Sequence, residues 1–261
     1  MIHPTSLISP SATLGPDVLV GPYAIIEADV QIGAGCHIEA HAQVLSGVRM
    51  GDNNTVGRAA IIGAEPQSLG FDRKVPSGVR IGSGNTFREH VTIHRSVHPG
   101  GETIVGNDNF LMAGAHLGHD VILTDRTVLA NHVLIAGHVV IGSRCFLGGG
   151  AVFHQFIRIG DLAMVQGGSA FSRDIPPYCT GFLLNRVEGL NTVGLRRAGF
   201  DSSARLELKR AWAEVYRSPL GPVKAAARAQ EEARWTEAAR NFLEFVANPG
   251  AKGVAGPGRD R

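Results

Sequence analysis

HLGHDVILTDRTVLANHVLIAGHVVIG, residues 116–142, places an aliphatic side chain at every sixth position. The aliphatic residues in question are Leu117, Leu123, Leu129, Ile135 and Ile141. A period of six matches neither an α-helix nor an alternating strand. It predicts short flat strands joined by tight turns in a parallel β-helix, where one aliphatic side chain per hexad points into a shared core.

The same period covers most of the chain that precedes and follows this stretch. Aliphatic or aromatic residues keep it over residues 2–62, 81–93 and 105–171. The segments 64–78 and 94–102 interrupt the hexads with proline, glycine and charge. We therefore expect two loops that leave the coil, and long loops in a compact domain usually serve a site.

Beyond the hexads the spacing of apolar residues becomes helical. Within residues 202–218 the apolar side chains recur mostly at helical intervals, and a serine precedes them as a cap. We expect a mainly β chain of two regions: a β-helix over residues 1–186, and a helical C-terminal domain over residues 187–261. The glycine- and proline-rich end, residues 249–261, is predicted to be a flexible tail.

Bulk composition excludes several classes of protein. The chain has 25 Lys and Arg against 23 Asp and Glu, for a net charge of +2, which argues against a nucleic-acid binder. No apolar run reaches the length of a membrane span, and the N-terminus lacks the features of a signal peptide. Three cysteines far apart in the sequence are interpreted as buried free thiols, so we expect a cytoplasmic protein.

The repeat resembles that of the hexapeptide-repeat acyltransferases. Members of this family form left-handed β-helices with three hexads, or about 18 residues, in each coil. The resemblance, rather than the spacing, implies the hand and the coil length. Residues 18 apart then lie about 4.8 Å from each other in neighbouring coils. Asp120 should therefore lie next to His138, and His119 next to Gly137.

This stacking gathers polar residues on one edge of the coil. The set contains His119, Asp120, Gly137, His138, His154 and Gln155, with His116 nearby. A histidine beside a carboxylate can act as a general base, and a glycine amide can donate to a developing oxyanion. The arrangement suits acyl transfer from a thioester to a hydroxyl or an amine. His132, by the same register, should fall on another part of the coil.

Longer motifs carry a closer resemblance. LMAGAHLGHD, LANHVLIAGHVVIG, GGGAVFHQFIRIG, RDIPPYCTG, REHVTIHR and GLRRAGF resemble the acyl-carrier-protein:UDP-N-acetylglucosamine O-acyltransferases over essentially the whole chain. The resemblance implies an enzyme that moves a 3-hydroxyacyl chain to the 3-position of the sugar nucleotide, as the first step of lipid A synthesis. His119 would be the general base, Asp120 would orient it, and the Gly137 amide would stabilise the oxyanion.

The resemblance also implies contacts to substrate and to partners. Its substrate contacts fall on Gln67, His116, His138, His154, Gln155, Asn191 and Arg197. Gly167 matches the position that limits acyl length, and a glycine there favours a long chain. The family assembles as homotrimers with active sites between subunits. The acyl-phosphopantetheine of acyl carrier protein is the donor, with no bound cofactor and no metal. A basic landing surface for that acidic protein is predicted at Arg196, Arg205, Lys209, Arg210 and Arg217, although a solvated helix face is an equal alternative.

Four residues depart from the family pattern, and all affect recognition of the acceptor. Ser68 and Gly70 replace an acidic and a basic residue, Val193 replaces a carboxylate, and Ala198 replaces the second of two arginines. A 3-amino sugar, another nucleotide sugar or a coenzyme A donor therefore remain alternatives. A β-helix zinc hydratase and a non-catalytic scaffold are weaker ones. His116 and His119 lie three apart, whereas the zinc ligands of the hydratases lie five apart. Acyl length, acyl hydroxylation and O- versus N-acylation are not predicted.

Overall fold

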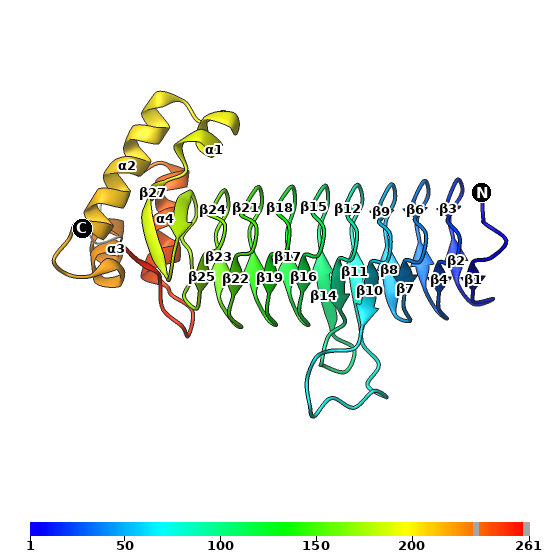
Figure 1. Ribbon diagram of the computed structural model, residues 1–261. Helices are drawn as coiled ribbons and strands as arrows, with labels where there is room; N and C mark the ends of the chain where they lie inside the picture. Colours follow the sequence, from blue (N-terminus) through cyan, green and yellow to red (C-terminus); the bar gives the residue numbers. More distant parts are fainter. Residues whose placement is uncertain (232–234, 258–261) are drawn as a thin grey trace.

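The computed structural model describes residues 1–231 and 235–257. The described chain is an elongated column of short strands with the N-terminus at one end and a cluster of helices at the other (Figure 1). Two loops project together from the side of the column, near its middle. The described strands form three sheets, one for each side of the coil, and the pairing is parallel except between β26 and β27 at the C-terminal end of the third sheet.

From β1 to β25 each sheet takes every third strand of the coil, which is what a turn after each hexad produces, and β26, β27 and β28 then extend the third sheet. The first sheet contains β1 (Leu7–Ile8), β4 (Ile25–Ile26), β7 (Gln43–Val44), β10 (Ile61–Ala64), β13 (Thr92–His94), β16 (His116–Leu117), β19 (Leu134–Ile135), β22 (Val152–Phe153) and β25 (Ala170–Phe171). The second contains β2 (Thr13–Leu14), β5 (Gln31–Ile32), β8 (Val48–Met50), β11 (Gly78–Ile81), β14 (Glu102–Val105), β17 (Ile122–Leu123), β20 (Val140–Ile141) and β23 (Arg158–Ile159). The third contains β3 (Leu19–Val20), β6 (His37–Ile38), β9 (Thr55–Val56), β12 (Thr86–Phe87), β15 (Phe110–Leu111), β18 (Val128–Leu129), β21 (Phe146–Leu147), β24 (Met164–Val165), β26 (Cys179–Phe182), β27 (Arg186–Leu190) and β28 (Gly256–Pro257).

The hexad residues form the core of the column. Leu117, Ile135 and Phe153 occupy successive inward positions of the first sheet and are almost fully buried. Each short strand buries only one such side chain, so stability comes from the contacts between coils. The three cysteines are buried and unpaired, as the sequence predicted.

A buried ladder of polar side chains runs up one inner corner. Asn85 Nδ2 donates to Asn54 Oδ1 at 2.9 Å, and Asn109 Nδ2 donates to Asn85 Oδ1 at 3.0 Å. The Thr127 amide then donates to Asn109 Oδ1 at 2.8 Å. The asparagines are 31 and 24 residues apart, whereas Asn109 and Thr127 are 18 apart. The ladder therefore holds the coils in register across both inserted loops.

Both insertions occur where they were predicted, between β10 and β11 and between β13 and β14. Arg95, in the second loop, fastens the first. Its Nη1 donates to the carbonyl of Val75 at 2.6 Å and its Nη2 to that of Arg73 at 3.0 Å. Its guanidinium also lies 4.9 Å from the centre of the Phe71 ring. The two loops thus behave as one projecting unit.

Within the described residues, four helices close the C-terminal end of the column. They are α1 (Thr192–Arg197), α2 (Ser202–Tyr216), α3 (Pro222–Gln230) and α4 (Glu237–Ala247). The Asp201 side chain caps α2 by accepting from the Ala204 amide at 2.7 Å. The inward faces of α2 and α4 bury residues such as Leu208, Val215 and Phe242. None of the described helices is long and apolar enough to cross a membrane.

An ion pair with a buried carboxylate ties these helices to the last coil. Asp174 is fully buried and accepts from Arg158 Nε at 2.9 Å and from the Gly250 amide at 2.8 Å. Arg158 Nη2 in turn donates to the carbonyl of Asn248 at 2.7 Å. Because both charges are satisfied by several partners, the pair fixes the chain after α4 against the coil.

The described part of the tail differs from the flexible segment expected over residues 249–261. Val254 and Ala255 are buried, and β28 pairs in parallel with β27. The open edge of β27 offers backbone groups that composition alone does not reveal, and these order the tail. The expected boundary at 186/187 also falls inside β27, and α1 begins only at Thr192. Residues 258–261 lie outside the described residues.

Candidate active site

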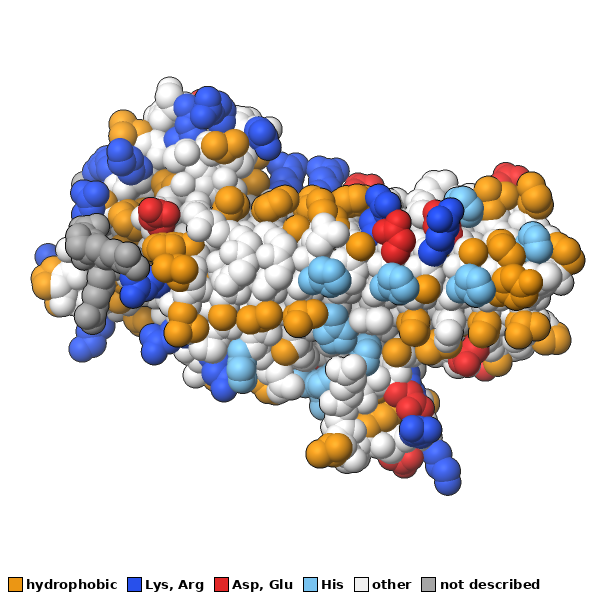
Figure 2. Space-filling model, viewed as in Figure 1, with side chains coloured by type: hydrophobic (Ala, Val, Ile, Leu, Met, Phe, Trp, Pro, Cys, Tyr) orange, Lys and Arg blue, Asp and Glu red, His pale blue; other side chains and the backbone are white. Residues whose placement is uncertain are grey.

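A groove of about 450 Å³ runs along the outer face of the first sheet. Histidine side chains gather where the projecting loops meet the column, and a stripe of apolar side chains leads from them toward the helical cap (Figure 2). His94, His116, His119 and His154 line the polar end of the groove, together with Gln155. The predicted edge of the coil is therefore a concave surface with a polar end and an apolar end.

His119 and Asp120 form a hydrogen-bonded pair at this edge. His119 Nδ1 lies 2.8 Å from Asp120 Oδ2, and the two side chains are only 15% and 11% exposed. Asp120 has a φ of 59°, a left-handed corner conformation that aspartate tolerates better than most residues. The corner turns the carboxylate back toward the imidazole that precedes it.

Asp120 is held by groups from the second loop. The Ser96 hydroxyl makes a short hydrogen bond to Oδ1, and the Val97 amide donates to Oδ2 at 3.2 Å. Burial favours the neutral acid, but the hydrogen bonds from Ser96, His119 and Val97 outweigh it and hold the pKa of Asp120 below its ordinary value. Because the charged carboxylate can only accept a hydrogen bond, a neutral His119 carries its proton on Nδ1. The lone pair of His119 Nε2 is then free to act as a base.

Gly137 lies directly against the His119 ring. A Cβ on Gly137 would come within 2.5 Å of His119 Cε1 and 2.7 Å of Nε2, so only glycine fits beside the base. Among the described residues none accepts a hydrogen bond from the Gly137 amide. Buried amides without an acceptor are rare, which makes this N–H available to a negatively charged oxygen in the groove.

His94 and His116 form the floor of the polar end. Their rings meet edge to face with centres 4.9 Å apart, and His116 Nδ1 lies 2.8 Å from the Thr92 hydroxyl. Burial, reinforced by the neighbouring histidines, lowers the pKa of His94 to about 4, and burial also lowers the pKa of His116. Both rings are therefore neutral hydrogen-bonding groups near pH 7. The sequence predicted His116 here but not His94.

The three other histidine and glutamine residues predicted for the site lie in two places. His154 and Gln155 line the groove, and His154 Nδ1 lies 3.2 Å from the Gln155 carbonyl oxygen. His138 lies beyond the groove, stacked on Phe156 with ring centres 4.5 Å apart. Its Nε2 is 3.8 Å from Asp120 Oδ2, as the 18-residue register predicted. Burial lowers the pKa of His138.

The apolar end of the groove is formed by outward residues of the first sheet. Leu134 and Val152 follow one another on β19 and β22 and are 45% and 40% exposed, and Ala170 and Leu184 continue the line. An apolar strip that begins beside a base offers an alkyl chain a place to lie. Gly167 lies outside this lining, at the corner where a Cβ would come within 2.9 Å of the Gly149 carbonyl oxygen.

Of the other predicted substrate contacts, Gln67 reaches the groove from the first loop. The structure separates two predicted residues, Asn191 and Arg197, from this groove within one chain. Asn191 and Arg197 instead line another groove, of about 920 Å³. Asn191 is also the N-cap of α1, with Oδ1 accepting from the Gly194 amide at 2.9 Å and Nδ2 donating to Leu162 at 2.9 Å. Arg197 is exposed.

Among the described residues, one group of side chains has the composition and spacing of a metal site. His98, Asp120 and His138 bring three ligand atoms within 4.8 Å of one another. The group does not contain His116 and His119, the histidines considered for a zinc hydratase. Ser96 and His98 were both missed from the sequence. The only sequence signal for these two residues is that they lie in the second interruption of the hexads. The 18-residue register does not predict the contact, because Ser96 and Asp120 are 24 residues apart.

Comparisons with known proteins agree with this geometry. A family model described as Udp N-acetylglucosamine O-acyltransferase, Domain 2, matches residues 174–255, and a bacterial transferase hexapeptide model matches residues 11–44 and 102–137. An acyl-[acyl-carrier-protein]–UDP-N-acetylglucosamine O-acyltransferase of Anaeromyxobacter sp. (strain Fw109-5) is 43% identical over 247 residues, which are 94% of this chain and 96% of that relative.

Solved structures give the same result over nearly the whole chain. A UDP-N-acetylglucosamine acyltransferase from Bacteroides fragilis 9343 matches with a TM-score of 0.91 at 36% identity, covering 97% of this chain and 99% of that one. One from Campylobacter jejuni matches with a TM-score of 0.92 at 34% identity, covering 98% and 99%. These likenesses confirm the predicted left-handed β-helix.

Proposed function

The chain belongs to the acyl-[acyl-carrier-protein]–UDP-N-acetylglucosamine O-acyltransferase family, and we propose that it moves a 3-hydroxyacyl chain from acyl carrier protein to the 3-hydroxyl of UDP-N-acetylglucosamine. In lipid A synthesis this transfer is the first step. One observation carries the proposal: the His119–Asp120 pair lies at the head of an apolar strip, beside the Gly137 amide, which has no acceptor among the described residues.

The reaction follows from these positions. His119 Nε2 takes the proton of the sugar hydroxyl as its oxygen attacks the thioester carbonyl. The carbonyl oxygen becomes an anion that the Gly137 amide stabilises. Collapse of this intermediate forms the ester and breaks the carbon–sulfur bond, and the departing thiolate receives the proton from His119. Asp120 stabilises the imidazolium between the two proton transfers.

The remaining groove residues bind the substrates. Polar contacts to the sugar come from Gln67, His116, His154 and Gln155, which line the groove, and from His138, which lies beyond it next to Asp120. The strip that Leu134 and Val152 begin receives the acyl chain. Gly167, at the corner between β24 and β25, is the position where a larger side chain would limit the length of the acyl chain.

We propose a homotrimer because Asn191 and Arg197 lie far from His119 within one chain. In a three-fold assembly these residues of a neighbouring subunit would complete the groove and hold the nucleotide, for which an arginine suits the phosphates. The donor is acyl-phosphopantetheine on acyl carrier protein, and the reaction needs no bound cofactor. The exposed basic residues of α2, Lys209 and Arg210, offer the acidic acyl carrier protein a docking surface. A cytoplasmic location stays a prediction.

The test is a direct assay with purified protein. UDP-N-acetylglucosamine is mixed with a panel of 3-hydroxyacyl carrier proteins, and acylated sugar nucleotide is measured by mass spectrometry, with His119→Ala as the control. We expect product that disappears in the variant. If the folded wild-type chain gives product only with a 3-amino or another nucleotide sugar, the substitutions at Ser68, Gly70, Val193 and Ala198 have changed the acceptor. Product that persists in His119→Ala would contradict the assignment of the base.

A further inference from the structure

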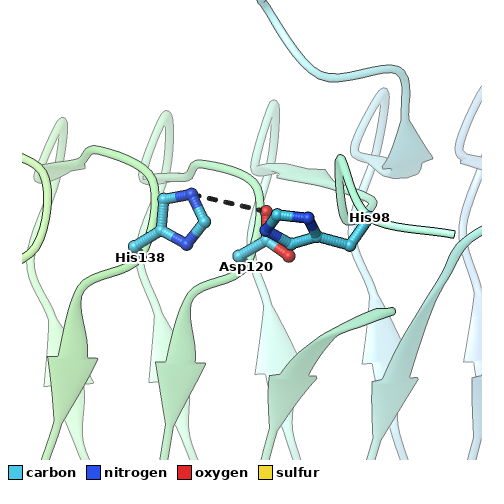
Figure 3. Close-up of side chains that lie close together, drawn as sticks. All are labelled: His98, Asp120 and His138. Atoms are coloured by element: carbon cyan, nitrogen blue, oxygen red, sulfur yellow. Dashed lines mark ion pairs between the residues drawn. The ribbon is translucent and has the colours of Figure 1, made fainter. Parts of the chain in front are cut away.

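A second set of side chains meets at Asp120, on the side away from the groove. His98 reaches over from the second loop, and His138 comes from the next coil (Figure 3). Their ring centres are 5.7 Å apart, with the Asp120 carboxylate between them. His98 is exposed, whereas Asp120 and His138 are half-buried, so the cluster is open to solvent on the His98 side.

The composition of this cluster is that of a transition-metal site. Two imidazoles and one carboxylate, with open positions for water, are a known ligand set for Zn²⁺ and chemically similar ions. Tetrahedral bonds of about 2.0–2.2 Å place ligand atoms about 3.4 Å apart. Asp120 Oδ2 and His138 Nε2 are already 3.8 Å apart, and all three ligand atoms lie within 4.8 Å. Rotation of the exposed His98 side chain would close the remaining distance.

The surroundings hold the ligands in place. Phe156 stacks on the His138 ring with an angle of 7° between their planes. The Ser96 hydroxyl binds Asp120 Oδ1 and also accepts from the His98 amide at 3.0 Å, which joins the loop to the carboxylate. Outer hydrogen bonds of this kind orient ligands and strengthen metal sites.

A metal here would compete with the catalytic pair. The oxygen nearest His138, Asp120 Oδ2, is also the partner of His119 Nδ1 at 2.8 Å. A cation bound to Oδ2 would draw the carboxylate from His119 and place positive charge near a ring that must itself become positive.

We propose that His98, Asp120 and His138 form an inhibitory site for a divalent transition-metal ion of the Zn²⁺ class, which stops acyl transfer by occupying Asp120. The binding half of the proposal is independent of the reaction. The inhibitory half rests on the proposed function.

Binding is tested on the untagged full chain with Co²⁺, whose visible absorption reports coordination by nitrogen and oxygen ligands. We expect saturable absorption at one ion per chain, displaced by Zn²⁺. His98→Gln should weaken binding at least about tenfold, the lower limit expected even for loss of an outer-shell partner. His90→Gln, which removes an exposed histidine from another corner, is the matched control and should bind as the wild type does. Absent absorption, or equal binding by His98→Gln, overturns the proposal.

Inhibition is tested in the acyl-transfer assay with added Zn²⁺. We expect the wild-type rate to fall and to recover with a chelator, and the midpoint of inhibition to rise at least about tenfold in His98→Gln. Without metal, His98→Gln should keep the wild-type rate. If the metal ion binds but the acyl-transfer rate does not fall, the proposal that the site is inhibitory is wrong. A chain that shows no transfer under any condition overturns the proposed function, while the Co²⁺ experiment still decides the site.

Discussion

Two corners of the same coil each present a histidine, but only one of these histidines lies close to a carboxylate. His132 and His138 are one hexad apart, and both have left-handed backbone, with φ of 57° and 60°. His138 is half-buried, stacked on Phe156 and close to Asp120. His132 is exposed and lies over Gly114.

The inserted loop explains the difference. Ser96 and Val97 fold over the His138 corner and bind Asp120, which buries the carboxylate and holds it charged. The corner at His132 receives no such loop from the described chain. The repeat therefore supplies equivalent backbone positions, and a loop converts one of them into a site.

Removing His119, whose ring lies against His138, and removing His132 in a separate variant tests this contrast most strongly. His119→Ala should lower the rate of acyl transfer by about 10³-fold, because a positioned general base contributes about 10²–10⁴-fold. His132→Ala should leave the rate within about twofold of the wild type, since surface substitutions rarely affect a distant site. Steady-state assays measure both, with circular dichroism as the check on folding. Comparable losses in the two variants would end the distinction between the corners.

A matched pair of glycines gives the next largest effect. Gly137→Ala would place a Cβ 2.5 Å from the His119 ring, and Gly114→Ala would place one 2.4 Å from the His132 ring. The displaced His119 should cost about 10²-fold in rate, the effect of a misplacement of about 1 Å. Gly114→Ala should cost about 1 kcal/mol of stability through its φ of +69°, with the rate unchanged. Urea unfolding and kinetics separate the two outcomes. An active Gly137→Ala would mean that His119 need not stay where it lies.

Ser96→Ala removes the loop's hydrogen bond without touching substrate. We expect kcat to fall about tenfold with KM unchanged, because a hydrogen bond to a charged group is worth about 1.5 kcal/mol or more. Ser96→Thr, which keeps the hydroxyl, should restore most of the rate. A loss confined to KM, or no recovery with threonine, would assign Ser96 a purely structural part.

The last prediction concerns how the stability of the fold depends on pH through the buried His94. His94 has a folded pKa of about 4 against an ordinary value of 6.5. Between these values the unfolded chain binds a proton that the folded chain does not, so the free energy of unfolding falls as pH drops from 6.5 to 4. The slope from this residue is at most about 1.4 kcal/mol per pH unit. Urea unfolding of His94→Gln between pH 7 and 5 should show a flatter dependence than the wild type. His132→Gln is the control, and a slope for His94→Gln equal to the wild type would refute the prediction.

Periodicity predicted the parallel β-helix, and the family resemblance supplied its hand and the coil length that places part of the site. The proximity of Asp120 to His138 and of His119 to Gly137 required only a coil of 18 residues. Ser96 and His98 could not be placed in this way, because an inserted loop follows its own path and shifts the register. The asparagine ladder shows that the register resumes after each loop, but nothing in the spacing says where the loop folds.

Long-range contacts explain the other differences. The tail looked flexible by composition, yet β28 pairs with β27, an edge that exists only once the cap has formed. Asn191 and Arg197 could not be assigned to a place because a family resemblance fixes residues in a sequence and not their distance from His119 within one chain.

The ladder of Asn54, Asn85, Asn109 and Thr127 has a consequence for how the protein is made. Its links join residues 31, 24 and 18 positions apart, so each coil needs only the next short length of chain to complete its bonds. A nascent chain leaving the ribosome can therefore settle coil upon coil in the order of translation, without waiting for its C-terminus. The contacts of Arg158 and Asp174 with the segment after α4 form after the coils, because that segment is translated later.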